Sequence, residues 1–61
     1  MTLKTKYIVG NLEWEIEIFD NDGGFYGIAT NENLSVMGTV QPSVKKALAD
    51  TQATTRRVWH V

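Results

Sequence analysis

The chain has 61 residues, no cysteine and a formal net charge of −1 at pH 7. That length allows one domain with a thin core, and the absence of cysteine excludes disulfides and thiolate metal sites. No stretch approaches the roughly 20 apolar residues of a membrane span, and the start has no apolar segment typical of a signal peptide. We therefore expect a single domain over residues 1–61, located in the cytoplasm.

The first two strands are predicted to form a hairpin. Residues 3–9 and 12–18 alternate between apolar and polar side chains, and Gly10-Asn11 between them is suited to a two-residue turn. This turn pairs Tyr7 with Trp14 on a nearly apolar face. On the other face it pairs Lys6 with Glu15 and Lys4 with Glu17. This register therefore makes one face nearly apolar and gives the other two pairs of opposite charge.

Two further turns, at Asp22-Gly23 and Glu32-Asn33, continue the sheet as a four-stranded antiparallel meander. The pairs predicted from these turns include Phe19 with Tyr26, Ile28 with Met37, Ala29 with Val36, Gly27 with Gly38 and Phe25 with Val40. The small residues among them leave room on the apolar face for the close approach of a helix.

A helix is predicted after Gln41-Pro42-Ser43, because proline is favoured in the first helical turn. It should run for about three turns, packed on the apolar face. The segment from Thr54 to Val61 is rich in β-forming residues and predicts a fifth strand, placed beside the first strand or against another subunit. The expected fold class is therefore α+β, with the element order β-β-β-β-α-β.

The second face of the sheet is less polar than a face that meets only water. The predicted register places five large apolar side chains on it, namely Ile8, Phe19, Tyr26, Ile28 and Met37. An apolar cluster bordered by charged residues often marks an interface. These five residues form the predicted protein interface, and a homodimer is favoured over a foreign partner. The alternatives are ordinary isolated apolar surface residues or a different register.

The acidic and basic residues are separated along the sequence. Six of the seven acidic residues lie between Glu13 and Glu32, and all six basic residues lie outside that interval. Pairing across strands is the simpler interpretation, and a dipolar surface that steers a charged partner is the alternative.

The chain shows no pattern typical of an enzyme. His60 is the single histidine and has no cysteine or second histidine with which to bind zinc. Glu13, Glu15 and Glu17 lie on a strand with lysines opposite two of them, which favours solvated ion pairs over acid–base catalysis. Residues 20–23 resemble the opening of a calcium-binding loop, but the later ligand positions are missing. We expect no catalytic residue, metal, cofactor or small-molecule substrate.

An alternative function is the binding of single-stranded or double-stranded nucleic acid. Arg56, Arg57, Trp59 and His60 would form a basic aromatic strand that contacts phosphates and stacks on bases. Two arginines alone make a small electrostatic footprint, so protein binding is favoured.

Several motifs between Trp14 and Leu48 carry a family resemblance: "DNDGGFYGIAT" at residues 20–30, the step Gly38-Thr39, and "KKAL" at residues 45–48. Together they resemble the HicB-like antitoxin fold. The chain departs from that family at residues 31–33, where a loop bearing proline and glycine is absent, and at Pro42-Ser43, which replaces an acidic helix start. It also lacks the additional DNA-binding segment of many such antitoxins.

The resemblance implies a β-β-β-α-β core, a tendency to dimerise and a habit of binding proteins, but toxin neutralisation is not carried over. The size and element order are also similar to small phage-encoded inhibitors of host RNA polymerase. We therefore expect a small non-enzymatic protein-binding or regulatory module from a phage or bacterium. It would be antitoxin-like or inhibitor-like and would self-associate through the outer sheet face.

Overall fold

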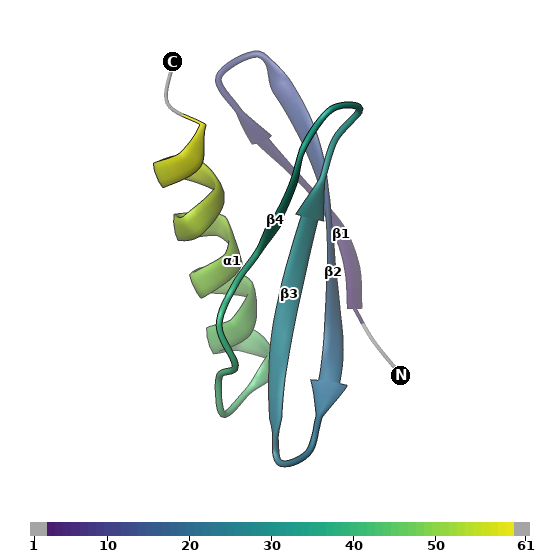
Figure 1. The fold of residues 1–61 in the computed structure, drawn as a ribbon, viewed down its shortest axis with the longest axis vertical. Coiled ribbons are helices and arrows are strands. Elements are labelled where there is room, and N and C mark those ends of the chain that lie inside the picture. The colour runs from purple at the N-terminus through teal and green to yellow at the C-terminus, as the bar shows by residue number, and fades with distance from the viewer. Residues whose placement is uncertain (1–2, 60–61) are drawn as a thin grey trace.

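The computed structural model describes residues 3–59. The elements are β1 (Leu3–Val9), β2 (Leu12–Asn21), β3 (Gly24–Thr30), β4 (Ser35–Met37) and α1 (Val44–Val58). The strands form one antiparallel sheet in chain order, and α1 lies across one face of it (Figure 1). The predicted α+β class, with a four-stranded meander and one helix on one face, is confirmed.

The first two hairpins have the predicted register. Tyr7 faces Trp14 across β1 and β2, and Phe19 faces Tyr26 across β2 and β3. Gly10 lies in the first turn with a φ of 63°. Glycine adopts this left-handed conformation without the steric cost that a side chain would add, so the turn sequence and the register agree.

The pairing of β3 with the chain after β4 differs from the prediction by one residue. Phe25 forms a bridge with Gln41 instead of Val40, and its N–H donates to the Gln41 carbonyl at 2.8 Å. One extra residue therefore lies in this part of the chain, as in a β-bulge. Next to it, the carboxylate of Asp50 on α1 accepts a hydrogen bond from the Thr39 backbone N–H at 2.8 Å. Val40 is 54% exposed.

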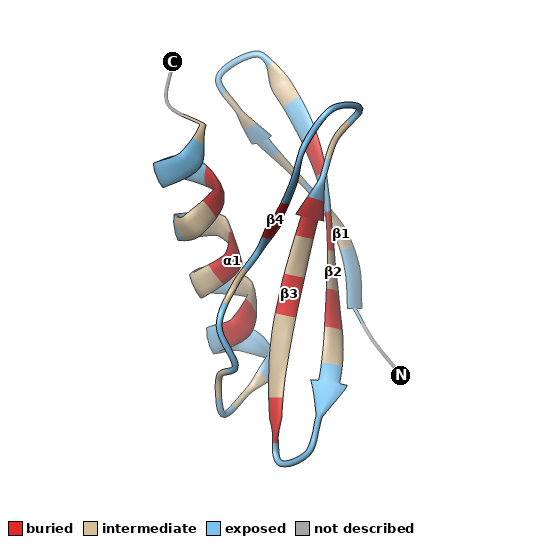
Figure 2. Cartoon of the chain, in the orientation of Figure 1, coloured by how far each residue is buried: buried red, intermediate tan, exposed pale blue. Residues whose placement is uncertain are grey.

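The core lies between the sheet and α1. Its buried apolar residues are Trp14, Ile16, Ile18, Ala29, Val36 and Ala47. Figure 2 shows the buried positions alternating along β2 and β3, as expected for a sheet that buries one face. Trp59 packs edge-on against Trp14, with ring centroids 6.4 Å apart, and closes the end of the core near the helix C-terminus.

Two glycines allow the helix to approach closely. A Cβ added to Gly27 would clash with the Thr51 hydroxyl and would lie 2.8 Å from Ile18 Cδ1. A Cβ added to Gly38 would lie 2.7 Å from the Asp50 carboxylate. The expectation that small sheet residues make room for the helix is confirmed.

The helix starts where the sequence predicts and ends later. The Ser43 hydroxyl accepts a hydrogen bond from the Lys46 N–H at 3.1 Å, as an N-cap residue does. The helix then continues to Val58. The predicted fifth strand is therefore wrong for residues 54–58, and its last two residues, 60 and 61, lie outside the described part.

Buried threonines explain this difference. The hydroxyls of Thr51 and Thr55 each donate to the carbonyl four residues earlier, at 2.7 Å. Both side chains are fully buried. A threonine whose hydroxyl is satisfied within its own helix can be buried at low cost. Packing against the sheet therefore outweighs the β propensity of these residues.

Candidate interaction surfaces

The outer face is the sheet face turned away from α1, and all five predicted interface residues lie on it. Ile8 and Met37 are 67% and 65% exposed, while Phe19, Tyr26 and Ile28 are half-buried. Strand alternation places them opposite the core residues of the same strands. The outer face therefore carries apolar surface that contributes nothing to the core beneath α1.

The structure brings four of these residues together and separates the fifth. Ile8 faces Glu13 across β1 and β2, whereas Glu17, four residues further along β2, faces Ile28. This places Ile8 roughly 13 Å along the sheet from the row of Ile28 and Met37, and about 20 Å from the row of Phe19 and Tyr26, at about 3.3 Å per residue. We call the remaining group the apolar cluster; it consists of Phe19, Tyr26, Ile28 and Met37.

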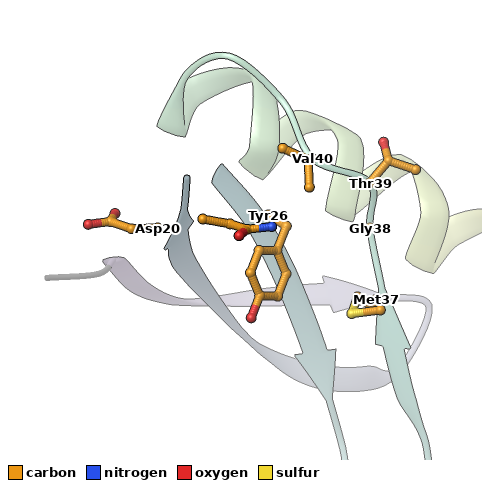
Figure 3. A pocket seen from close by; sticks show the side chains of 7 residues that line it. Asp20, Tyr26, Met37, Gly38, Thr39 and Val40 are labelled. Carbon is orange, nitrogen blue, oxygen red and sulfur yellow. The ribbon is translucent and has the colours of Figure 1, made fainter. Parts of the chain in front are cut away.

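Aromatic stacking organises the apolar cluster. The Phe19 and Tyr26 rings are stacked, with centroids 5.4 Å apart and planes at 26°. Met37 faces Ile28 from the neighbouring strand β4. Beside them lies an open hollow of about 450 Å³, lined by Tyr26, Met37 and Val40 among others. Figure 3 shows the Tyr26 ring projecting between Asp20 on β2 and Met37 on β4. The lining is mixed, because Asp20, Asn21 and Thr39 also border this hollow.

The other end of the outer face is charged. Lys6 Nζ lies 3.1 Å from a carboxylate oxygen of Glu13, and both side chains are largely exposed. Lys6 faces Glu15 in the backbone register, as predicted, but its ion pair is with the diagonal neighbour Glu13. Glu13 accepts a hydrogen bond from the ammonium group, which raises the pKa of Lys6. A second open hollow of about 450 Å³ lies here, lined in part by Thr30 and Glu32.

Among residues 3–59, no three side chains of histidine, cysteine, aspartate or glutamate are grouped so that they could hold a metal ion. An acidic and a basic residue do pair across strands, but the partner of Lys6 is Glu13 and not the predicted Glu15, and this exposed ion pair is of the weakly stabilising kind.

The predicted basic aromatic strand does not exist as such. Arg56 and Arg57 lie in the last turn of α1, where they are exposed. Trp59 packs against Trp14 in the core, so its ring is not presented beside the arginines. His60 lies outside the described residues. The correction follows from the longer helix, which turns the arginines to solvent and the tryptophan inward.

The helix also exposes two cationic residues that the prediction of a nucleic-acid site omitted. Lys45 and Lys46 are exposed in the first turn of α1. The missing signal was spacing: Lys45 and Arg56 are eleven residues apart, which is about three helical turns, so a continuous helix brings both to the same side. A strand over residues 54–61, as predicted from their β propensity, would not place Lys45 and Arg56 on one side.

Comparison of the chain with known protein families, with curated proteins and with solved structures finds no match. Within residues 3–59, no helix combines the length and apolar character needed to cross a membrane. Function is therefore inferred from the chemistry of the surfaces described above.

Proposed function

We propose that this protein is a small non-enzymatic binding module that self-associates through its outer sheet face. The observation that supports this most is the apolar cluster of Phe19, Tyr26, Ile28 and Met37, which lies opposite a core that α1 already closes. The proposal assigns no catalytic residue, metal or cofactor.

The residue types of the apolar cluster suit a protein interface. Aromatic residues and methionine are enriched at the centres of interfaces, and charged residues at their rims. Here the stacked rings of Phe19 and Tyr26 present rigid apolar area, and Met37 adds an adaptable side chain. Glu17, in the same row as Ile28, begins the charged part of the face. This arrangement supports an apolar centre with a charged border.

A second copy of the chain is the occupant that we propose. A two-fold interface needs one patch that is complementary to itself, and an apolar sheet face meets that condition by packing face to face at about 10 Å. Small domains have thin cores and gain stability from such association. The resulting assembly would have four layers: helix, sheet, sheet and helix.

The resemblance of Trp14–Leu48 to the HicB-like antitoxin fold supports a regulatory use of such a module, antitoxin-like or inhibitor-like. A protein of that kind would act by occupying the surface of a partner. We place it in the cytoplasm, in keeping with a chain that has no cysteine.

Molar mass in solution tests the proposal. Light scattering on a size-exclusion column should give twice the chain mass for the wild type and the chain mass for Phe19→Glu combined with Met37→Glu, because two carboxylates would enter the apolar contact. Ala53→Glu, on the exposed side of α1, is the control and should leave the dimer intact. A monomeric wild type at high concentration would overturn self-association. A double variant that is still dimeric would show that the interface lies outside the apolar cluster.

A further inference from the structure

The solvent-facing side of α1 carries positive charge at both ends. The residues on this side, which we call the basic helix face, are Lys45, Lys46, Ala49, Gln52, Ala53, Arg56 and Arg57. All are exposed except Gln52, which is half-buried. At 100° per residue these positions fall within an arc of about 140°, opposite the buried positions Ala47, Thr51 and Thr55.

Asp50 is the single acidic residue of α1, against the four cations of the basic helix face. Its carboxylate accepts two hydrogen bonds from Thr39, from the backbone N–H at 2.8 Å and from the hydroxyl at 3.1 Å, so it is held at the loop that precedes the helix. Four cations and one acidic residue give the helix a formal net charge of +3.

Helix stability does not explain the two lysines. The first turn of α1 contains no acidic residue, and Lys45 and Lys46 lie at the end where the helix dipole is positive. Cations at this end are destabilising, whereas Arg56 and Arg57 at the other end are favourable. The lysines therefore suit a role outside the helix, in the attraction of an anionic partner.

We infer that the basic helix face binds the phosphate backbone of double-stranded DNA. The two cationic pairs are about 16 Å apart along the axis, at 1.5 Å per residue from Lys45 to Arg56. The major groove is about 12 Å wide, so a helix lying across it reaches the phosphates on both borders. Between the cations, Ala49 and Ala53 are small, and Gln52 lies half-buried at the edge of this face, so the helix can approach the groove closely.

A duplex fits this surface better than a single strand or a second copy of the chain. Single-strand binding needs aromatic rings on which bases stack, and the basic helix face has none. A second copy that placed its acidic outer face on this helix would make a head-to-tail contact, which leaves both ends open to further growth. Duplex binding requires only charges at the observed spacing and small residues between them.

This inference does not rest on self-association. The helix α1 covers one face of the sheet (Figure 1). The apolar cluster lies on the other face, and the basic helix face is the side of α1 turned away from the sheet, so the two surfaces lie on opposite sides of the molecule. A face-to-face dimer would leave both helices uncovered and pointing in opposite directions, so the two surfaces can be tested separately.

Salt-dependent DNA binding provides the test, with a fluorescein-labelled duplex of mixed sequence and about 20 base pairs followed by fluorescence polarisation. If all four cations contact phosphates, log K should fall with log salt at a slope of about −3.6, which is a loss of about 150-fold between 50 and 200 mM salt. Lys45→Ala combined with Arg56→Ala should bind more weakly and lower the loss to about 12-fold, because two contacts remain.

Lys4→Ala combined with Lys6→Ala is the matched control, because it removes the same charge from the outer face and should keep the wild-type slope. Circular dichroism establishes that each variant is folded. The inference is overturned by an absence of duplex binding at 50 mM salt, or by a control that lowers the slope as much as the helix variant does. It is also overturned if the helix variant changes the molar mass at low salt while no duplex is bound, since the occupant would then be a second copy.

Discussion

The two faces of the sheet are both apolar in part, yet they are built in opposite ways. On the inner face, Ile16 and Ile18 are fully buried because Gly27 and Gly38 allow α1 to approach closely. On the outer face, no described element covers the apolar cluster, and Met37 is 65% exposed. Apolar area stabilises a fold only where folding removes it from water. The inner face therefore stabilises the monomer, and the outer face holds area that association can still bury.

Isoleucine occurs on both faces, and the largest difference in stability is expected between its truncation on the inner face and its truncation on the outer face. Ile16→Ala should cost about 2–5 kcal/mol, because it removes buried methyl groups and leaves a cavity. A chain of this size has a total stability of only about 3–9 kcal/mol, so this variant should lose a large part of its stability. Ile8→Ala should change the free energy of unfolding by less than about 0.5 kcal/mol.

Urea denaturation of both isoleucine variants in dilute solution, followed by circular dichroism, measures this contrast. Equal losses at the two positions would mean that the outer face contributes to the monomer as much as the inner face does.

The close approach of the helix can be tested at Gly27. Gly27→Ala should cost about 1–3 kcal/mol, because the added methyl group would overlap the Thr51 hydroxyl and crowd Ile18. Gly23→Asn is the comparison: nothing lies within 4 Å of a Cβ at that position, so its cost is limited to the strain of a φ of 83°, which asparagine accommodates better than most residues with a side chain. Thermal unfolding of both variants should show a clearly larger loss for Gly27→Ala, and similar losses would refute the tight contact.

The N-cap of α1 should have a smaller effect. Ser43→Ala removes the acceptor of the Lys46 N–H and should cost about 1 kcal/mol. Ser35→Ala, at an exposed position of β4, should cost less than about 0.5 kcal/mol. Chemical denaturation of the two variants measures their free energies of unfolding and so distinguishes an N-cap serine from an ordinary surface serine. A Ser43→Ala protein as stable as the wild type would contradict the assigned cap.

The smallest effect is expected from the Lys6–Glu13 pair on the outer face. The pKa of Lys6 is raised, chiefly by its hydrogen bond to Glu13, so the protonated form is favoured in the folded state. The stabilisation is therefore fully present below the unfolded value of 10.5 and is lost as the pH rises through the raised folded value. Lys6→Gln should lower the melting temperature slightly at pH 7, and this effect should disappear only above the raised folded pKa of Lys6, on the alkaline side of 10.5. If the melting temperatures of the wild type and Lys6→Gln differed by the same amount at all pH values, the Lys6–Glu13 ion pair would be excluded as the cause of that difference.

Short-range patterns were sufficient to predict the sheet from the sequence. Gly10-Asn11 and Asp22-Gly23 fix the turns, and strict alternation along β2 fixes which residues point inward. The apolar cluster followed from the same register. Residue alternation predicts which side chains lie on the outer face, and the interface itself is a proposal drawn from their apolar character.

Long-range contacts decided the features that the sequence did not predict. The bulge near Val40 lies beside hydrogen bonds between Thr39 and Asp50, a contact between residues eleven apart that turn and strand patterns do not predict. The length of α1 depends on the burial of Thr51 and Thr55 against the sheet, which local β propensity cannot anticipate. The basic helix face was missed for the same reason, since it exists only if the helix continues to Arg57.

The concentration dependence of thermal unfolding tests the central claim most directly. A protein whose outer face is buried in a dimer should melt at a higher temperature as its concentration rises, because association stabilises the folded state by mass action. Phe19→Glu combined with Met37→Glu should remove this dependence while leaving a cooperative transition from the intact inner core. A wild-type melting temperature that stays constant from micromolar to millimolar concentration would contradict self-association through the outer face.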